Sequence, residues 1–558
     1  MTPEPMPGPS SPGVPAAAPM HAAMAALIAS AALGAWAAAE SDSAATLLNQ
    51  MLLAGAGYAF VWAAARFGGR GNDAAAGLVL AGVVAAVYFL AQYQYLALDA
   101  KVAWLDALAR ATSRPFAQVE GWAPFPNSLA TFLDGIAGVA LGLTLGNGRR
   151  SGRGLSAIAL GLIVLAVLTS ASRGSWLAVA AATAIGVWTA RRLPAPPLWA
   201  VGTTSALVVL AVIAGVVAQS RPWWIQLAAL AGRPDRLEVY QHAATLLRDV
   251  PFTGIGAGEQ FAAHLSKYAL LIQVPYLTYS HNLLLELWLE LGLPGMAAWC
   301  ALAAATLAGI AAAERAGCGW RTRGLWVGLL AIHLHGLSDA RPSIDAWTAV
   351  PFFVLTALLA ARLGRRGVRL RPMAAAAPLV VGLLVVATVA AARGPLGAAW
   401  QANLGAVTQA RADVGAPAAV DGERWRAAAA RHFAAALAAN DRDVAARRRW
   451  GMLHLDADRF DDARSHLRVA ERLDRATLST RKAAGLAAMW TGDVHEAVRL
   501  LGDLPGITAE LNTWSHWRRS REETALAVHA ARVSLAIDPS QAGVHAALAS
   551  WDSKSSQR

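Results

Sequence analysis

A histidine and an asparagine stand directly before an apolar stretch that glycines interrupt. His281 and Asn282 are followed by nine residues and then by Gly292-Leu-Pro-Gly295. We predict a helix that begins at His281, with Ser280 as its N-terminal cap. The positive end of the helix dipole would favour the neutral imidazole, which can accept a proton, and the free amides of the first turn would attract phosphate. The segment therefore suits chemistry on an anionic substrate; the alternative is a histidine that only caps a membrane span.

Arginines form the second set of candidates, because the planar guanidinium stays charged and binds phosphate bidentately. Arg173 stands in a short loop between two predicted spans, on the side where an orienting arginine is not expected. Arg236 and its neighbour Arg233 stand at the start of another predicted helix, where a solvated face is the alternative. We predict that Arg173 and Arg236 neutralise phosphate, and that Arg233, Arg248 and Arg341 are weaker candidates.

The carboxylate of Glu286 and two glycines complete the predicted substrate contacts, together with Asn282. Glu286 and Glu290 are four residues apart and share one helix face, so we expect them to meet a cavity or polar partners rather than lipid. A solvated face is the alternative. Gly254 and Gly256 lie in a turn-forming stretch that looks suited to phosphate. No parallel strand precedes this stretch and it lacks a P-loop lysine, so a nucleotide site is not predicted.

Two further polar patterns have a structural interpretation. Asp235 and Glu238 resemble a capping box, which predicts a helix that runs to about Arg248. His335 and Asp339 lie one turn apart in a predicted span. We expect a buried polar pair near its outer end, with a structural role favoured over catalysis.

The composition is that of a membrane protein. The chain has 558 residues, of which 56% are hydrophobic and only 15% charged. A hydrocarbon core of about 30 Å takes about 20 apolar residues per helix. We predict eleven spans, at residues 20–39, 44–65, 74–96, 127–146, 154–171, 175–190, 197–218, 294–313, 324–340, 344–361 and 373–392.

Arginines in the short loops orient these spans. The loops 66–73, 147–153, 191–196, 314–323 and 362–372 are rich in arginine, whereas the intervening short loops hold only Arg173 and Arg341. The positive-inside rule places the first set in the cytoplasm, with the N-terminus inside and the C-terminal region outside. The net charge of +12 is largely this orienting set, so it does not indicate nucleic-acid binding.

Residues 1–19 are rich in Pro, Ala and Ser, and we predict a disordered tail there. Residues 20–392 form the predicted membrane domain, with a large extracytoplasmic loop at 219–280. The two cysteines, Cys300 and Cys318, make a structural disulfide unexpected, and no metal-ligand spacing occurs. We therefore predict neither a metal nor another cofactor.

Residues 393–558 have the composition of a soluble helical domain with a repeat period of 34. Gly451 corresponds to Gly485 at that offset, and Leu467 corresponds to Leu501. The period, with small residues where two helices touch, resembles tetratricopeptide repeats, although most Trp and Tyr positions of their consensus are missing. The predicted fold class is thus all-α: a polytopic membrane bundle and a helical solenoid. Solenoids usually bind a protein through their concave surface, so a protein partner is a further expectation.

Taken together, the motifs resemble those of the O-antigen ligase and polymerase superfamily of bacterial GT-C-type membrane glycosyltransferases. The resemblance covers roughly residues 20–392. It rests on the order of four elements: Ser172-Arg173-Gly174, Arg236 with its helix, Asp249-Val-Pro-Phe-Thr-Gly-Ile-Gly256, and His281-Asn282 with nine residues before Gly292. Relatives often have a tryptophan where this chain has Glu238 and Tyr240.

The resemblance implies transfer of an undecaprenyl-diphosphate-linked glycan to an acceptor hydroxyl, on lipid A-core or on another acceptor, at the outer face of the inner membrane. His281 is then the general base or the group that orients the acceptor, and Arg173 and Arg236 hold the diphosphate. A repeat-unit polymerase is the alternative. A flippase or transporter of lipid-linked sugars is less favoured, because the spans show no clear internal repeat. A scaffold that only presents the repeat domain would leave the placement of His281 and the arginines unexplained.

Overall fold

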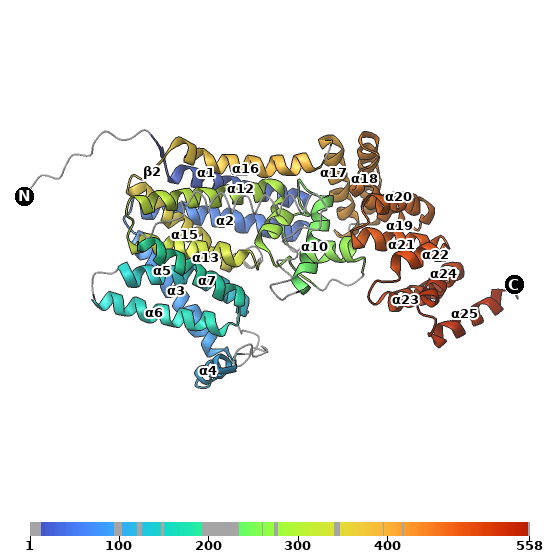
Figure 1. The fold of residues 1–558 in the computed structure, drawn as a ribbon, viewed down its shortest axis with the longest axis horizontal. Coiled ribbons are helices and arrows are strands. Elements are labelled where there is room, and N and C mark those ends of the chain that lie inside the picture. The colour runs from blue at the N-terminus through green and yellow to red at the C-terminus, as the bar shows by residue number, and fades with distance from the viewer. Residues whose placement is uncertain are drawn as a thin grey trace, which may run out of the picture.

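The computed structural model describes residues 13–93, 103–119, 125–146, 150–191, 234–258, 260–272, 277–339, 346–393, 395–415 and 418–555. The chain is a bundle of long apolar helices, joined at one end to a domain of shorter helices (Figure 1). The all-α prediction is therefore confirmed. The bundle helices are α1 (Ala17–Ala37), α2 (Ser41–Arg66), α3 (Gly71–Ala91), α4 (Ala103–Ser113), α5 (Pro126–Gly146), α6 (Arg150–Thr169), α7 (Arg173–Ala190), α12 (Leu283–Arg315), α13 (Trp320–Gly336), α15 (Ala346–Arg365) and α16 (Pro372–Ala392).

Eight of the described helices are long and apolar enough to cross a membrane, so the chain is a multi-pass membrane protein. They are α1, α2, α3, α5, α6, α12, α15 and α16. The predicted spans at 175–190 and 324–340 correspond to α7 and α13, which have 18 and 17 residues and are not among these eight. Both pack on α5 within the bundle. The predicted span at 197–218 lies outside the described residues.

Close contact between α5 and α13 sets the register at the centre of the bundle. A Cβ atom at Gly138 would lie 2.3 Å from the backbone nitrogen of Gly328, and one at Gly142 would lie 2.7 Å from Cα of Gly324. Small residues spaced four apart allow helices in lipid to approach this closely, where van der Waals packing drives association. The antiparallel register carries Asp134, one turn before Gly138, to the end of α13.

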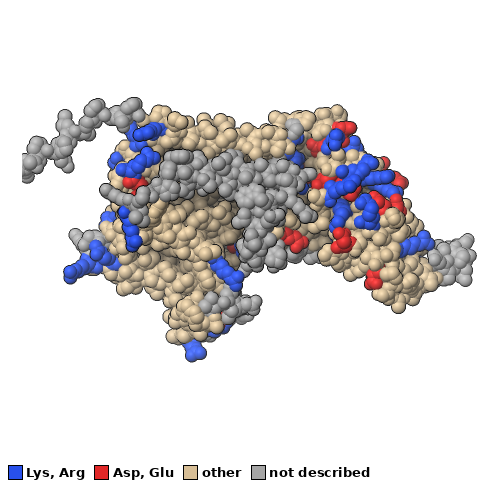
Figure 2. Space-filling model, viewed as in Figure 1, with Lys and Arg blue, Asp and Glu red and all other residues tan. Residues whose placement is uncertain are grey.

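The two ends of the bundle differ in charge. Basic residues gather at one end, and an uncharged belt separates them from the mixed charges of the C-terminal domain (Figure 2). At the basic end, Arg365 Nε donates to the carbonyl of Arg66 at 3.1 Å, and Arg362 donates to Asn72 at 2.8 Å. The loops that the arginine count grouped together, 66–73 and 362–372, thus lie on one side of the bundle.

The N-terminal segment also lies at this basic end. The strand β1 (Val14–Pro15) pairs with β2 (Arg369–Leu370), and α1 begins at Ala17. The prediction of a disordered tail is therefore wrong for residues 13–19. Pairing with β2 satisfies backbone groups of this Pro-rich stretch, and Pro19 falls in the first turn of α1, where no amide hydrogen is needed. Residues 1–12 lie outside the described part of the chain.

A break divides α12, as the sequence predicted. Gly292 has φ of 68° and ψ of −172°, a conformation closed to residues with a side chain. The turn 250–256 enters this break. The amides of Ile255 and Gly256 donate to the carbonyl of Leu289 at 2.8 and 3.2 Å, and the amide of Leu293 donates to Phe252 at 3.0 Å. The turn therefore satisfies backbone groups that the break would otherwise leave buried and unpaired.

The C-terminal domain consists of successive helical hairpins. Its helices are α17 (Leu396–Asp413), α18 (Ala419–Ala439), α19 (Val444–Asp456), α20 (Phe460–Leu473), α21 (Leu478–Trp490), α22 (Val494–Leu501), α23 (Ile507–Ser520), α24 (Thr524–Ile537) and α25 (Ala542–Ser555). A Cβ at Gly451 would lie 2.5 Å from Leu467, and one at Gly485 would lie 2.6 Å from Leu501. The small-to-large contact therefore recurs with the period of 34 residues found in the sequence.

A segment between the bundle and this domain holds the two together. It comprises α10 (Pro234–Asp249), α11 (Phe261–His264) and the π-helix η2 (Leu265–Leu270). The start and end of α10 agree with the prediction from the capping box. The buried carboxylate of Asp249 pairs with Arg448 of α19, and Arg448 also donates to the carbonyl of Tyr268 at 2.9 Å. The guanidinium of Arg449 lies 3.3 Å from the centroid of the Tyr268 ring. The surface formed by α19 and α21 thus contacts a segment of its own chain, and Lys482 of α21 donates to the carbonyl of Leu270 at 3.1 Å.

Candidate functional site

Several predicted site residues come together at the C-terminal end of α13. We call residues 335–339 the α13 end. Three elements converge on it: the start of α7, the start of α10 and the turn before α12. Asn282 Nδ2 donates to the carbonyl of Leu337 at 3.0 Å, and Arg236 donates to the carbonyl of Ser338. A Cβ on Gly174 would lie 2.4 Å from Ser338 Oγ. Residues 55 to 164 positions apart in sequence therefore meet in one place.

The helix α10 presents Arg236 and Tyr240 on one face, since residues four apart lie one above the other. Tyr240 donates from its hydroxyl to the carbonyl of His281 at 3.0 Å. Burial raises the pKa of Tyr240, and the nearby Arg236 opposes this shift. The phenol therefore stays protonated and keeps its donor role. One helix thus holds the arginine at the α13 end and fixes the backbone that carries the histidine.

The turn before α12 differs from the prediction. The helix begins at Leu283 rather than at His281, and its cap is Asn282 rather than Ser280. Asn282 Oδ1 accepts from the amides of Leu284 and Leu285 at 3.0 and 3.1 Å. The amide nitrogen of the same side chain donates to the carbonyl of Leu337, so Asn282 also links the start of α12 to the α13 end. Asn282 therefore has a structural role, and the first-turn amides predicted to attract phosphate are already bonded.

His281 consequently lies outside the helix. Its φ of 55° places it in the left-handed region, which is uncommon for a residue with a side chain. The ring is half-buried, and its centroid lies 4.1 Å from that of Tyr279. The predicted effect of the helix dipole on this imidazole is correspondingly weaker, because that effect falls off within the first turn.

Glu286 and Glu290 are both buried, at 1% and 4% exposure, so a solvated face is excluded. Glu286 accepts a hydrogen bond from the amide of Ser280 at 2.7 Å. The carboxylate thereby orders the turn that contains His281. The expectation of polar partners is confirmed for Glu286, although this partner is a backbone amide of the same turn.

A buried polar chain connects α5, α13 and α7. His335 Nδ1 lies 2.6 Å from Asp134 Oδ2, and His335 Nε2 lies 3.4 Å from Ser172 Oγ. Ser175 donates to the other oxygen of Asp134. The contact between Nδ1 and Oδ2 is short enough for one hydrogen shared between the imidazole and the carboxyl group. The prediction that His335 pairs with Asp339 is therefore corrected: the ring pairs with Asp134, a residue that only the α5 register brings near.

The hydrogen bonds among Asp134, His335, Ser172 and Ser175 position the start of α7, where Arg173 lies. Ser172 is the residue before the helix, and Gly174 packs directly on His335 and Ser338. A side chain at position 174 would displace α7 from the α13 end. Arg173 itself is exposed, and within the described parts of the chain its guanidinium has no hydrogen-bond or ion-pair partner. It is therefore available to an anionic ligand.

Other predicted contacts lie elsewhere. Gly254 and Gly256 have φ of 68° and 105°, and their amides donate to Val250 and Leu289, so they serve the break in α12 rather than a phosphate. Arg248 is three turns from Arg236, about 18 Å along α10. It contacts Thr477 of the C-terminal domain at 2.9 Å. Arg233 and Arg341 lie outside the described residues.

Sequence reasoning missed Asp134, Ser172 and Tyr240 as parts of this site. A carboxylate inside an apolar span was the available signal for Asp134, because such a charge is costly in lipid and needs partners. Within the described residues, no group of three or more His, Cys, Asp or Glu side chains is arranged to hold a metal ion.

Comparison with known families bears on this arrangement. Residues 158–300 match the family model described as O-antigen ligase. This segment belongs to the O-antigen ligase family. The ligase-family segment contains Arg173, Arg236 and His281, together with the turn 250–256 and the first half of α12. The match supports a membrane glycosyltransferase of the ligase or polymerase type. No curated protein matches the chain.

Proposed function

We propose that the chain transfers a glycan from undecaprenyl diphosphate to an acceptor hydroxyl, in the manner of an O-antigen ligase, at the outer face of the inner membrane. The observation that carries the proposal is the shared anchoring of Arg236 and His281. Arg236 of α10 bonds to Ser338 at the α13 end, and Tyr240 of the same helix bonds to the backbone carbonyl of His281.

In the proposed reaction, the acceptor oxygen attacks the anomeric carbon and the bond from that carbon to the diphosphate oxygen breaks. His281 accepts the hydroxyl proton, or orients the hydroxyl, and the configuration at the anomeric carbon inverts. The diphosphate leaves as an anion whose charge Arg173 and Arg236 neutralise. Exposed Arg173 and half-buried Arg236 flank the α13 end, which supports a phosphate position between α7 and α10.

Placement also favours an enzyme over a transporter. Transporters of lipid-linked substrates bind them near the bilayer midplane, between repeats. Here the candidate residues lie at the ends of α7, α10 and α13, on the side of the bundle that faces the C-terminal domain. A polymerase would use the same groups, with another lipid-linked repeat unit as the acceptor.

A gel of surface glycans from the native host tests the proposal. A deletion strain is compared with strains that carry His281→Ala or, as the matched control, the exposed His495→Ala, all at equal protein levels. We expect the deletion and His281→Ala to lose the same glycan while lipid-linked glycan accumulates, and His495→Ala to retain it. Accumulated long chains indicate a ligase, and single repeat units indicate a polymerase. A normal pattern with His281→Ala would overturn the role of His281.

A further inference from the structure

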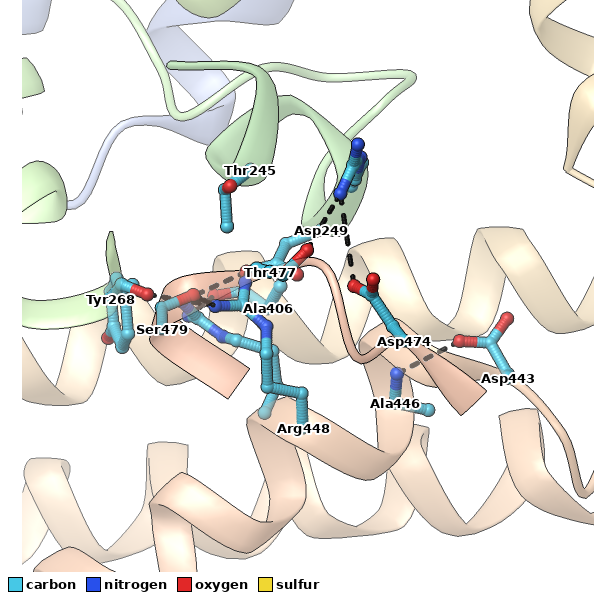
Figure 3. Close-up of polar contacts among 12 residues, drawn as sticks. Thr245, Asp249, Tyr268, Ala406, Asp443, Ala446, Arg448, Asp474, Thr477 and Ser479 are labelled. Atoms are coloured by element: carbon cyan, nitrogen blue, oxygen red, sulfur yellow. Dashed lines mark hydrogen bonds and ion pairs between the residues drawn. The ribbon is translucent and has the colours of Figure 1, made fainter. Parts of the chain in front are cut away.

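A polar pocket lies where the last membrane span meets the C-terminal domain. It has a volume of about 240 Å³. Ala392 and Arg393 at the end of α16 form one wall, and the C-terminal turn of α10 forms another. The loops before α19 and α21 close it. Figure 3 shows residues of α10, including Thr245 and Asp249, facing Arg448, Asp474 and Thr477 of the C-terminal helices. The pocket therefore lies at the membrane surface, separate from the α13 end.

Positive charge is in excess in this pocket. Four arginines line it, against three aspartates: Arg248, Arg393, Arg442 and Arg448, and Asp249, Asp443 and Asp474. A fifth arginine behind the wall, Arg449, shares Asp249 with Arg448, at 3.7 Å. The aspartates thus leave about two positive charges without compensation.

The pocket also holds unused donors. Arg393 Nη2 donates to the carbonyl of Arg248 at 2.5 Å, but Arg393 Nε is buried with no hydrogen-bond partner in the described structure. Arg442 is exposed at the rim, and its guanidinium contacts no acceptor among the described residues. A buried donor without a partner costs free energy that a bound acceptor would recover.

Burial in the pocket wall disfavours the charged form of two of these arginines, Arg248 and Arg393. Burial lowers the pKa of Arg248 and of Arg393, and for Arg248 the neighbouring Arg448 and Arg393 add to this shift while Asp474 opposes it. A phosphate monoester carries a charge of about −1.5 to −2 at neutral pH and offers several acceptor oxygens, which matches both the charge excess and the unused donors.

We infer that this pocket binds a phosphate group, as carried by an anionic lipid headgroup at the membrane surface or by a soluble phosphate. The inference is independent of the proposed glycan transfer. A ligand here contacts the C-terminal turn of α10, the helix whose N-terminal part holds Arg236 and Tyr240. Its binding therefore fixes α10 between the C-terminal domain and the α13 end.

Native mass spectrometry of the detergent-solubilised full chain tests the lipid source, with phosphatidic acid, whose headgroup is a phosphate monoester, and phosphatidylcholine as probes. Thermal unfolding in inorganic phosphate, against chloride at equal ionic strength, tests the soluble source. We expect retention of phosphatidic acid over phosphatidylcholine, stabilisation by phosphate, or both. Arg442→Gln and Arg393→Gln should weaken whichever binding is seen by about tenfold, since a charge-assisted bond is lost.

Two controls separate this result from folding and from catalysis. Arg424→Gln changes an exposed arginine of α18 outside the pocket and should bind as the unchanged chain does. His281→Ala should also bind normally, so a failure of the proposed transfer leaves this test intact. Equal retention of the two lipids with no effect of phosphate would overturn the inference. So would normal binding by Arg442→Gln and Arg393→Gln together.

Discussion

Tyr240 donates its hydroxyl hydrogen to the backbone carbonyl of His281 at 3.0 Å, which ties α10 to the turn before α12. Arg236 lies one turn earlier on the same helix and bonds to the α13 end. The left-handed conformation of His281 needs external support, because a residue with a side chain adopts it at a cost. The Tyr240 bond supplies part of that support.

Replacing Tyr240 with Phe should therefore reduce glycan transfer more than it reduces stability. A neutral hydrogen bond contributes about 1 kcal/mol, so we expect roughly a fivefold loss of transfer rate with little change in protein level. Transfer is measured in membranes with lipid-linked donor. The matched control is Tyr58→Phe, which removes a 2.7 Å bond to His21 of α1, outside the α13 end. Equal loss in both variants would contradict a specific role for Tyr240.

Gly174→Ala should displace the start of α7 and with it Arg173. The added methyl would meet Ser338 Oγ at 2.4 Å and the His335 ring at 3.0 Å. We expect transfer to fall at least tenfold, because a small misplacement of a positioning group is costly in rate. Gly161→Ala is the control, since a Cβ there meets nothing within 4 Å. In a helix interior that control should be neutral or slightly stabilising. Normal transfer by Gly174→Ala would show that Arg173 does not depend on this contact.

Breaking the Asp249–Arg448 pair should destabilise the junction between α10 and the C-terminal domain. Both side chains are 3% exposed. Removing one partner of a buried pair costs about 3–5 kcal/mol, because it leaves an uncompensated charge. We therefore expect Asp249→Asn, which leaves Arg448 and Arg449 without their shared carboxylate, to lower the unfolding temperature of the solubilised protein clearly. Arg481→Gln breaks a more exposed pair with Asp503 and should cost at most about 1 kcal/mol. Similar shifts for the two variants would contradict the importance of the buried pair.

Acid should weaken the same region through His264. Burial lowers the pKa of this histidine from 6.5 to about 4. The unfolded chain then binds more protons than the folded chain between these values, so stability is complete above pH 6.5 and falls as the pH drops toward 4. The loss is on the order of 3 kcal/mol at most.

Unfolding temperatures measured between pH 7.5 and 4.5 check this prediction. His264→Gln removes the titrating group, so its curve should be flatter than that of the unchanged chain by the contribution of His264. The exposed His495→Gln serves as the control and should follow the unchanged chain. Parallel curves for all three proteins would mean that His264 does not cause the acid sensitivity.

The residues of the chain by themselves determined the membrane bundle, the position of the loops 66–73 and 362–372 on one side of it, and the period of 34 residues. Apolar runs long enough for a bilayer specify spans whatever their neighbours are, because lipid leaves backbone groups no partner outside the helix. The break at Gly292 and the extent of α10 were also predictable, since glycine and capping residues act over a few positions. The family resemblance followed from the same local motifs.

Tertiary structure alone decided what those motifs do. The α5–α13 glycine contacts bring Asp134 to His335, more than 200 residues apart, in place of the local partner Asp339. Long-range contact also assigned the turn 250–256 to the break in α12, and the side-chain amide nitrogen of Asn282 to the α13 end. The type of a side chain determines which bonds it can make. Its actual partner depends on which helices pack together in the bundle. The contact of Arg248 with Thr477 of the C-terminal domain is likewise a tertiary one, which its position on α10 did not reveal.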